Sequence, residues 1–312
     1  MQPLHGSGEV AVAAEQPVVA ASVFKVLGAC VVESRFAQRQ LDRRERVALP
    51  AAGRTPGQVG VHTLNAAAAE LGLDHTHVVS DLQTMLDSIG HDAGFGDYAC
   101  LAAWQPDHPE DPALADVEQR VRSSAALDPA RATRTTSRDM VRLLRGIWTD
   151  QAGPAEACAR VRDLMAHQLT PHRLASGFGP PVRVAASSGG LLGVVRNEDG
   201  VINYPDGHSY LAAVFTRAGT PNGGEAAINT AIVRAAAAAV SALRHQDTVS
   251  PENDAAARPS TAFRTRPGVI ARVWSAKRGC APGRRQGGPR RLRSPEPGLP
   301  DRMPCPALDT RA

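Results

Sequence analysis

Apolar residues along much of the chain recur at intervals of three and four, which is the spacing of one helix face. This pattern predicts helices at residues 22–39 and 61–72, the second ending at a glycine, a residue type favoured just beyond a helix C-terminus. Two further helices are predicted after a Thr-Thr-Ser start at residue 135 and from Pro154, because these residue types are favoured where a helix begins. An alanine-rich stretch at residues 224–245 predicts a last helix.

Short apolar runs separated by glycine and proline predict strands between the last two helices and near the N-terminus. Pro205-Asp206-Gly207 is typical of a turn that joins two strands of a hairpin. A strand, then helices, a sheet and a final helix together predict an α+β fold, with an antiparallel sheet flanked by helices. Residues 81–126 give no clear pattern. The predicted strands lie at residues 9–13, 182–186, 191–197, 200–204 and 209–216.

The charge of the chain divides it into two parts. The 312 residues carry a formal net charge of +4, but residues 246–312 alone carry +7, which leaves −3 on residues 1–245. The basic part is also rich in proline, glycine and arginine, so it buries too little apolar surface to offset the entropy of ordering. We therefore expect a folded domain at 1–245 and a disordered basic tail at 246–312. A basic arm attracted to RNA or a membrane is one interpretation of this tail, and a non-functional extension is the one we favour.

The sharpest chemical feature is Ser22-Val23-Phe24-Lys25 at the start of the first predicted helix. One helical turn separates the hydroxyl of Ser22 from the ammonium of Lys25, which places the two within reach of each other. A desolvated lysine can accept the serine proton, and the helix N-terminus favours the developing alkoxide. The chain contains only two lysines, Lys25 and Lys277, so this spacing has little chance of arising at random. We predict that Ser22 is a nucleophile and Lys25 its base.

At this point the chain resembles the class A beta-lactamases and their actinobacterial serine-hydrolase relatives, over residues 8–245. The resemblance rests on Ala21-Ser22-Val23-Phe24-Lys25-Val26-Leu27, on Thr135-Thr136-Ser137-Arg138-Asp139-Met140, which is similar to the family's Thr-Thr-Pro helix start, and on the predicted strands of residues 184–216. It implies a beta-lactamase/transpeptidase-like fold. It also implies that the backbone N–H groups of Ser22 and Gly190 form an oxyanion hole.

Several motifs of the family are altered. The Lys-Ser/Thr-Gly triad is replaced by Ser187-Ser188-Gly189, so Ser188 is expected to bind a substrate carboxylate and Ser187 marks a lost anchor. Arg183 or Arg196 could supply the missing charge, since guanidinium pairs with carboxylate, although an ordinary exposed arginine is the simpler interpretation.

The family's Ser-Asp-Asn helix and its deacylating glutamate are not found at the expected places. A segment before Val61 is expected to be missing, which predicts a partly truncated helical half. Ser80-Asp81-Leu82 is interpreted as a chance match, because it falls too late in the chain. No Glu-x-x-Leu-Asn is present, and Asp87 and Asp92 are the acidic residues in roughly the right region.

These observations favour a serine hydrolase that opens beta-lactam rings through an acyl-enzyme on Ser22, with impaired turnover. The alternative is an inactive, decayed homologue or a weak binder of beta-lactams or peptidoglycan fragments. We expect a monomer with a small beta-lactam or peptidoglycan-like substrate, and neither a nucleic acid nor a membrane as partner. No cofactor or metal is expected, because no CxxC pair is present and His75-Thr76-His77 lacks further ligands. The first eight residues show no signal peptide, whereas members of the family are usually exported.

Overall fold

The computed structural model describes residues 1–44, 60–104, 112–169, 172–219 and 224–249. Three long strands form the centre of the fold: β4 (Arg183–Leu191), β5 (Val195–Asn203) and β6 (Ser209–Arg217). The short β1 (Gln2–Pro3) pairs with the outer side of β6, so the antiparallel sheet has the order β1-β6-β5-β4. This order leaves β4 at an edge.

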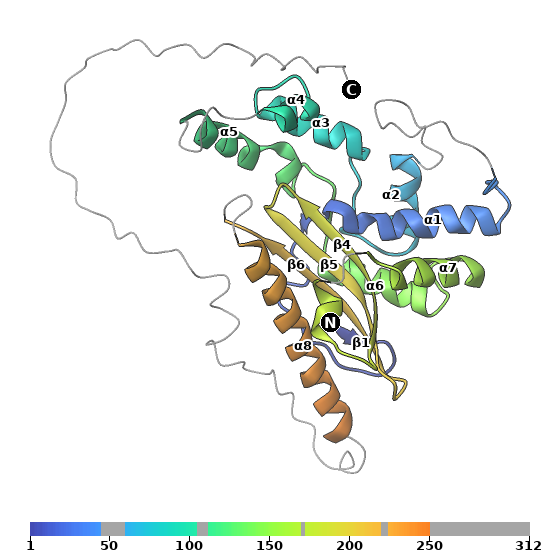
Figure 1. The fold of residues 1–312 in the computed structure, drawn as a ribbon. Coiled ribbons are helices and arrows are strands. Elements are labelled where there is room, and N and C mark those ends of the chain that lie inside the picture. Colours follow the sequence, from blue (N-terminus) through green and yellow to red (C-terminus); the bar gives the residue numbers. More distant parts are fainter. Residues whose placement is uncertain (45–59, 105–111, 170–171, 220–223, 250–312) are drawn as a thin grey trace, which may run out of the picture. The chain divides into compact units, whose positions relative to one another are not determined.

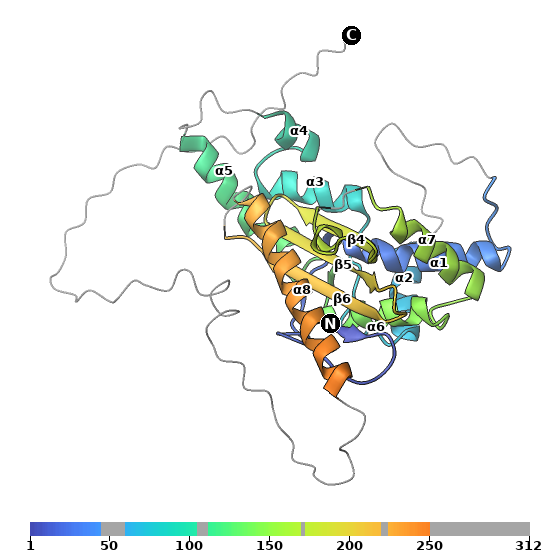
Figure 2. The same ribbon diagram turned by 60° about the horizontal axis from the view of Figure 1, so that its bottom comes forward.

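Helices cover both faces of this sheet, as Figures 1 and 2 show. On one face, α8 (Glu225–Val249) packs with η3 (Leu174–Gly177) against side chains such as Ile202 and Tyr210. On the other face, Val201 and Leu211 join a core with α1 (Lys25–Ala37), α6 (Ser137–Trp148) and α7 (Ala155–Ala166). Successive side chains of a strand point to opposite faces, so one strand supplies both cores. The predicted α+β class is confirmed.

Two smaller groups of elements complete the described part of the chain. Beyond one end of the sheet, α3 (Leu82–Asp92), α4 (Tyr98–Ala103) and α5 (Pro112–Ser123) lie together, followed by η2 (Ala125–Leu127). Nearer the sheet, β2 (Val18–Val19) pairs with β3 (Arg134–Thr135) and leads into η1 (Ala21–Phe24). The remaining helix, α2 (Val61–Glu70), packs on α1.

The predicted helices are present, with one difference at the first. Thr136 caps α6 by accepting a hydrogen bond from the N–H of Asp139, as the Thr-Thr-Ser start indicated. The predicted helix at 22–39, by contrast, begins as the 3-10 turn η1 and becomes α-helical only at Lys25. The disordered tail was predicted from residue 246, but α8 continues to Val249, so residues 246–249 are helical. The predicted gap before Val61 and the tail from residue 250 onward lie outside the described residues.

The strand predictions need two corrections. Residues 191–197 and 200–204 were predicted as separate strands, but β5 runs unbroken from Val195 to Asn203. The predicted break fell at Glu198-Asp199, two acidic residues that are nevertheless buried within β5. Gly200 stands where β5 approaches β4 closely: a Cβ there would lie 2.5 Å from the carbonyl oxygen of Ala185. The real turn is Leu192-Gly193, both with positive φ, which suits a tight hairpin. Residues 9–13 form no strand.

The last helix is long and apolar enough, by length and composition alone, to cross a membrane over Glu225–Gln246. Its buried residues form one stripe that packs on the sheet: Ile232, Ala236, Val240 and Leu243. This is the packing of an amphipathic core helix.

Candidate functional site

Ser22 lies on a strained turn at the edge of the sheet. The preceding residue, Ala21, has a φ of 48°, in the left-handed region that residues with a Cβ rarely adopt. The turn places Ser22 in the wall of a small cavity of about 80 Å³ between η1, α3 and the end of β4. The cavity is lined by Ala21, Ser22, Phe24, Ser80, Asp81, Leu82, Met85, Leu86, Thr133, Gly190 and Leu191.

The interpretation of Ser80-Asp81 as a chance match was wrong, because both residues line the cavity of Ser22. The chain before Ser80 returns alongside β3, where the N–H groups of His77 and Arg134 each donate to the other's carbonyl at 3.0 and 2.9 Å. The side chain of Asn65 fixes the same segment through both backbone polar groups of Val78, each at 2.8 Å. The position of Ser80 along the chain gave no indication that it lies beside Ser22. The Ser-Asp dipeptide was the one feature of the sequence that pointed to it.

Asp81 has a structural task in this cavity. Its carboxylate caps α3 by accepting from the backbone N–H and the hydroxyl of Thr84, both at 2.8 Å. These hydrogen bonds lower the pKa of Asp81, so it is charged at neutral pH. The Asp81 side chain is exposed, and both of its carboxylate oxygens already accept hydrogen bonds from Thr84.

The triad position on β4 comes close to the serine turn. A Cβ on Gly189 would lie 3.1 Å from both the carbonyl oxygen of Ala20 and the backbone nitrogen of Ser22, so a larger residue would push the serine turn and β4 apart by a few tenths of an ångström. Gly190 then lines the cavity next to Ser22. Ser188 donates a hydrogen bond to Glu198, and burial raises the pKa of that carboxyl. The structure therefore brings together Ser22, Gly189 and Gly190, and ties Ser188 to a buried acid.

Lys25 does not lie in the cavity wall. Its side chain is exposed, and it makes no hydrogen bond or ion pair with another described residue. Ser22 and Lys25 therefore have the expected spacing along the chain, but their side chains are not hydrogen-bonded in the structure. A role as base requires a bound substrate that covers the Lys25 side chain and excludes water from it.

Of the two arginines expected to replace the lost lysine, Arg196 stands directly opposite Gly190 on β5, whereas Arg183 is distant. Arg183 is exposed at the start of β4, four residues and roughly 13 Å of strand from Ser187. Arg196 is paired with Glu225 at 2.6 Å. A third arginine, missed in the sequence, is closer to the triad: Arg173 is 5% exposed and donates to the carbonyl oxygen of Gly189 at 3.3 Å.

Neither Asp87 nor Asp92 lines the cavity. Asp87 accepts from the side chain of Gln83 at 2.9 Å, on α3 itself. Asp92 accepts from the hydroxyl of Ser124 at 2.7 Å and from the N–H of Ala125 at 2.9 Å, so it fastens α3 to η2. Asp87 also accepts from the backbone N–H of Tyr98 on α4 at 3.5 Å, so both carboxylates link α3 to a neighbouring element.

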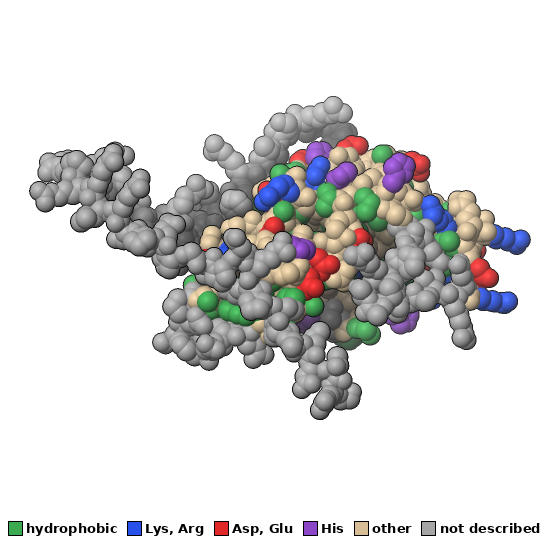
Figure 3. Space-filling view, turned by 90° about the horizontal axis from the view of Figure 1, so that it is seen from above, with side chains coloured by type: hydrophobic (Ala, Val, Ile, Leu, Met, Phe, Trp, Pro, Cys, Tyr) green, Lys and Arg blue, Asp and Glu red, His purple; other side chains and the backbone are tan. Residues whose placement is uncertain are grey.

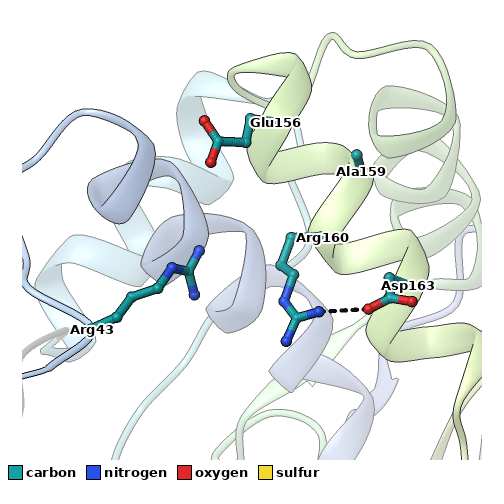
Figure 4. Close-up of a pocket in the computed structure, with 5 residues that line it drawn as sticks. All are labelled: Arg43, Glu156, Ala159, Arg160 and Asp163. Atoms are coloured by element: carbon teal, nitrogen blue, oxygen red, sulfur yellow. Dashed lines mark hydrogen bonds and ion pairs between the residues drawn. The ribbon is translucent and has the colours of Figure 1, made fainter.

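A wider hollow of about 500 Å³ lies at a distance from this site, between the chain after α1 and α7 (Figure 4). It is lined by Arg43, Glu156, Ala159, Arg160 and Asp163, and Arg160 pairs with Asp163 at 2.6 Å. These side chains include no nucleophile. Charges of both signs are also interspersed on the face seen from above in Figure 3.

Asp199 is a buried carboxyl directly opposite Ser187 on the neighbouring strand. It is 0% exposed, and neither of its oxygens has a hydrogen-bond partner in the described part of the chain. Burial raises the pKa of Asp199 well above its ordinary value, and Glu198 adds to the shift. Opposite residues share a sheet face, so a lysine at position 187 would reach this carboxyl.

Asp199→Asn is expected to stabilise the fold at neutral pH and to leave it unchanged near pH 3. A raised folded-state pKa means that Asp199 lowers stability progressively as pH rises above the unfolded pKa of about 4. The gain is expected to grow by about 1.4 kcal/mol for each pH unit above pH 4, because the folded state must keep Asp199 protonated while the unfolded chain ionises it, and to level off where the folded-state carboxyl titrates. Urea unfolding of both proteins between pH 3 and 8 measures it. A constant difference at every pH would contradict the assignment.

The chain is similar to known proteins. Residues 1–243 match the family described as "Beta-lactamase enzyme family". Over 106 residues the chain is 38% identical to "Beta-lactamase regulatory protein BlaB" of Streptomyces cacaoi, covering 30% of this chain and 34% of that protein. The chain thus spans about a third of the length of this curated relative. Among the described residues no group of three metal-ligating side chains is found.

Solved structures share the fold at low sequence identity. A beta-lactamase from Sphaerobacter thermophilus is 18% identical, with a TM-score of 0.52, over 76% of this chain and 87% of its own. A mutant of PBP-A, solved as an acyl-enzyme complex with penicillin G, is 17% identical with a TM-score of 0.54, over 79% and 88%. At these identities the comparison shows the fold alone.

Proposed function

Because the chain belongs to the beta-lactamase enzyme family, whose fold it shares, we propose that Ser22 is acylated by beta-lactams or related peptidoglycan-like acyl donors. The observation that carries the proposal is the cavity in which Ser22, Ser80 and the backbone of Gly190 meet. A nucleophile, a second hydroxyl and a backbone donor in one cavity are the parts that acyl transfer needs.

In the proposed reaction, substrate binding covers Lys25, which releases its own proton to solvent and becomes a neutral amine. The Oγ of Ser22 attacks the carbonyl carbon of the lactam, and this amine accepts the serine proton. The N–H groups of Ser22 and Gly190 stabilise the oxyanion. The carbon–nitrogen bond of the ring then breaks. The hydroxyl of Ser80 donates its proton to the leaving nitrogen, and the protonated Lys25 returns a proton to Ser80. The hydroxyl of Ser188 exchanges its hydrogen bond to Glu198 for one to the substrate carboxylate.

A second function, recognition without rapid hydrolysis, is supported by two observations. The matched curated relative is named as a regulatory protein of beta-lactamase. In addition, the single carboxylate among the described residues of the cavity wall is Asp81, which is engaged as a helix cap. A long-lived acyl-enzyme would slow a hydrolase, but it would suit a sensor of beta-lactams.

Incubation with a fluorescent penicillin tests the proposal. A covalent band is expected on a denaturing gel, because the label forms an ester with Ser22. Prior incubation with unlabelled penicillin should suppress the band, which controls for non-specific attachment. Absence of labelling at millimolar reagent would contradict acylation.

A further inference from the structure

The chain that leads into Ser22 is held from two sides by backbone and side-chain contacts. The N–H of Ala20 donates to the carbonyl oxygen of Thr133 at 2.9 Å. The side-chain amide of Asn197, on β5, donates from Nδ2 to the carbonyl oxygens of Val19 at 2.9 Å and Ala20 at 3.1 Å. These two carbonyls belong to the two residues that precede Ala21, whose backbone is left-handed.

Ala21 does not hold this conformation by itself. The left-handed region brings the Cβ of an L-residue too close to the backbone, so it is populated only where surrounding contacts impose it. If the contacts before Ala21 were removed, its φ is expected to relax to negative values. That rotation would turn the N–H of Ser22 away from Gly190.

Asn197 is itself held in a fixed orientation. Its side chain is 1% exposed, and its Oδ1 accepts from the backbone N–H of Thr216 at 3.3 Å, which assigns Nδ2 as the donor toward Ala20. One nitrogen of Arg173 donates to the carbonyl oxygens of both Asn197, at 2.8 Å, and Gly189, at 3.3 Å. Asn197 and Arg173 together therefore hold the turn of Ser22 and the strand that carries Gly190 through hydrogen bonds.

We propose that Asn197 is a positioning residue for acylation: its amide keeps Ala21 left-handed, and so keeps the N–H groups of Ser22 and Gly190 directed at one point. The proposal rests on the proposed acylation of Ser22. Asn197 acts through the backbone and contacts no substrate.

Asn197→Ala is expected to lower the second-order rate constant for labelling by fluorescent penicillin at least tenfold, equivalent to about 1.4 kcal/mol. Adding Ala21→Gly is expected to recover much of this loss, because glycine adopts positive φ without strain. Ala13→Gly provides the matched control: Ala13 also has a positive φ, of 51°, but lies outside the cavity wall. It should not rescue.

The rescue separates positioning from general stability. A purely structural role for Asn197 predicts that Ala21→Gly leaves labelling slow in the double variant, and that result would overturn the proposal. Wild-type labelling rates in Asn197→Ala would overturn it as well. Asn197→Ser, which keeps a short donor, provides a milder variant if Asn197→Ala does not fold, and the same rescue is expected. If the wild-type chain is not labelled at Ser22, the proposed function fails, and the inference fails with it.

Discussion

Ser22→Ala is expected to lose all covalent labelling by penicillin, because no other group in the described cavity wall combines a hydroxyl with the strained turn next to Gly190. Lys25→Ala should lose nearly as much, since nucleophile and base act as one unit and their effects do not add. The measurement is the second-order rate constant of labelling, taken from band intensity over time.

Two serine controls belong to this experiment. Ser123→Ala, at the exposed end of α5, should label like the wild type. Ser80→Ala should slow labelling without abolishing it, because water can replace a proton-transferring hydroxyl at a cost of about 10²–10⁴ in rate. Undiminished labelling of Ser22→Ala would show that another residue is the nucleophile.

Release of the acyl group is expected to be slow, with an acyl-enzyme that persists for minutes or longer. Deacylation needs a base to activate water, and such help contributes about 10²–10⁴-fold. Asp81 is charged but caps α3, while Asp87 and Asp92 hold α3 to its surroundings outside the cavity wall.

A chromogenic cephalosporin measures this release directly. One equivalent of product should appear in a burst, followed by a slow steady rate equal to the rate at which the acyl group leaves. Rapid steady-state hydrolysis would contradict the account and would make Asp81→Asn the first variant to examine.

The sequence predicted the parts of the fold in which local signals agree with tertiary packing. The capped start at Thr136 and the helix after Pro154 were correct because capping chemistry is local. The break predicted at Glu198-Asp199 was wrong because acidic residues are usually exposed, whereas here the pairing of β5 between β4 and β6 buries both.

The site was predictable where spacing along the chain determines it. Ser22, Gly189 and Gly190 belong to recognisable motifs, and the structure brings them together. Ser80 reaches the cavity through a returning loop, and the pairing of His77 with Arg134 that fixes this loop has no local signal. Arg173 was missed for the same reason, since its contacts with Gly189 and Asn197 join distant parts of the chain.

The most direct test of the account is the site of the adduct in the native chain. After incubation with penicillin G, the intact protein should gain the full mass of one penicillin, because ring opening by a serine loses no atoms. Digestion and tandem mass spectrometry should place that mass on Ser22. No adduct at millimolar penicillin, or an adduct on any other residue, would contradict the assignment of Ser22 as the acylated nucleophile.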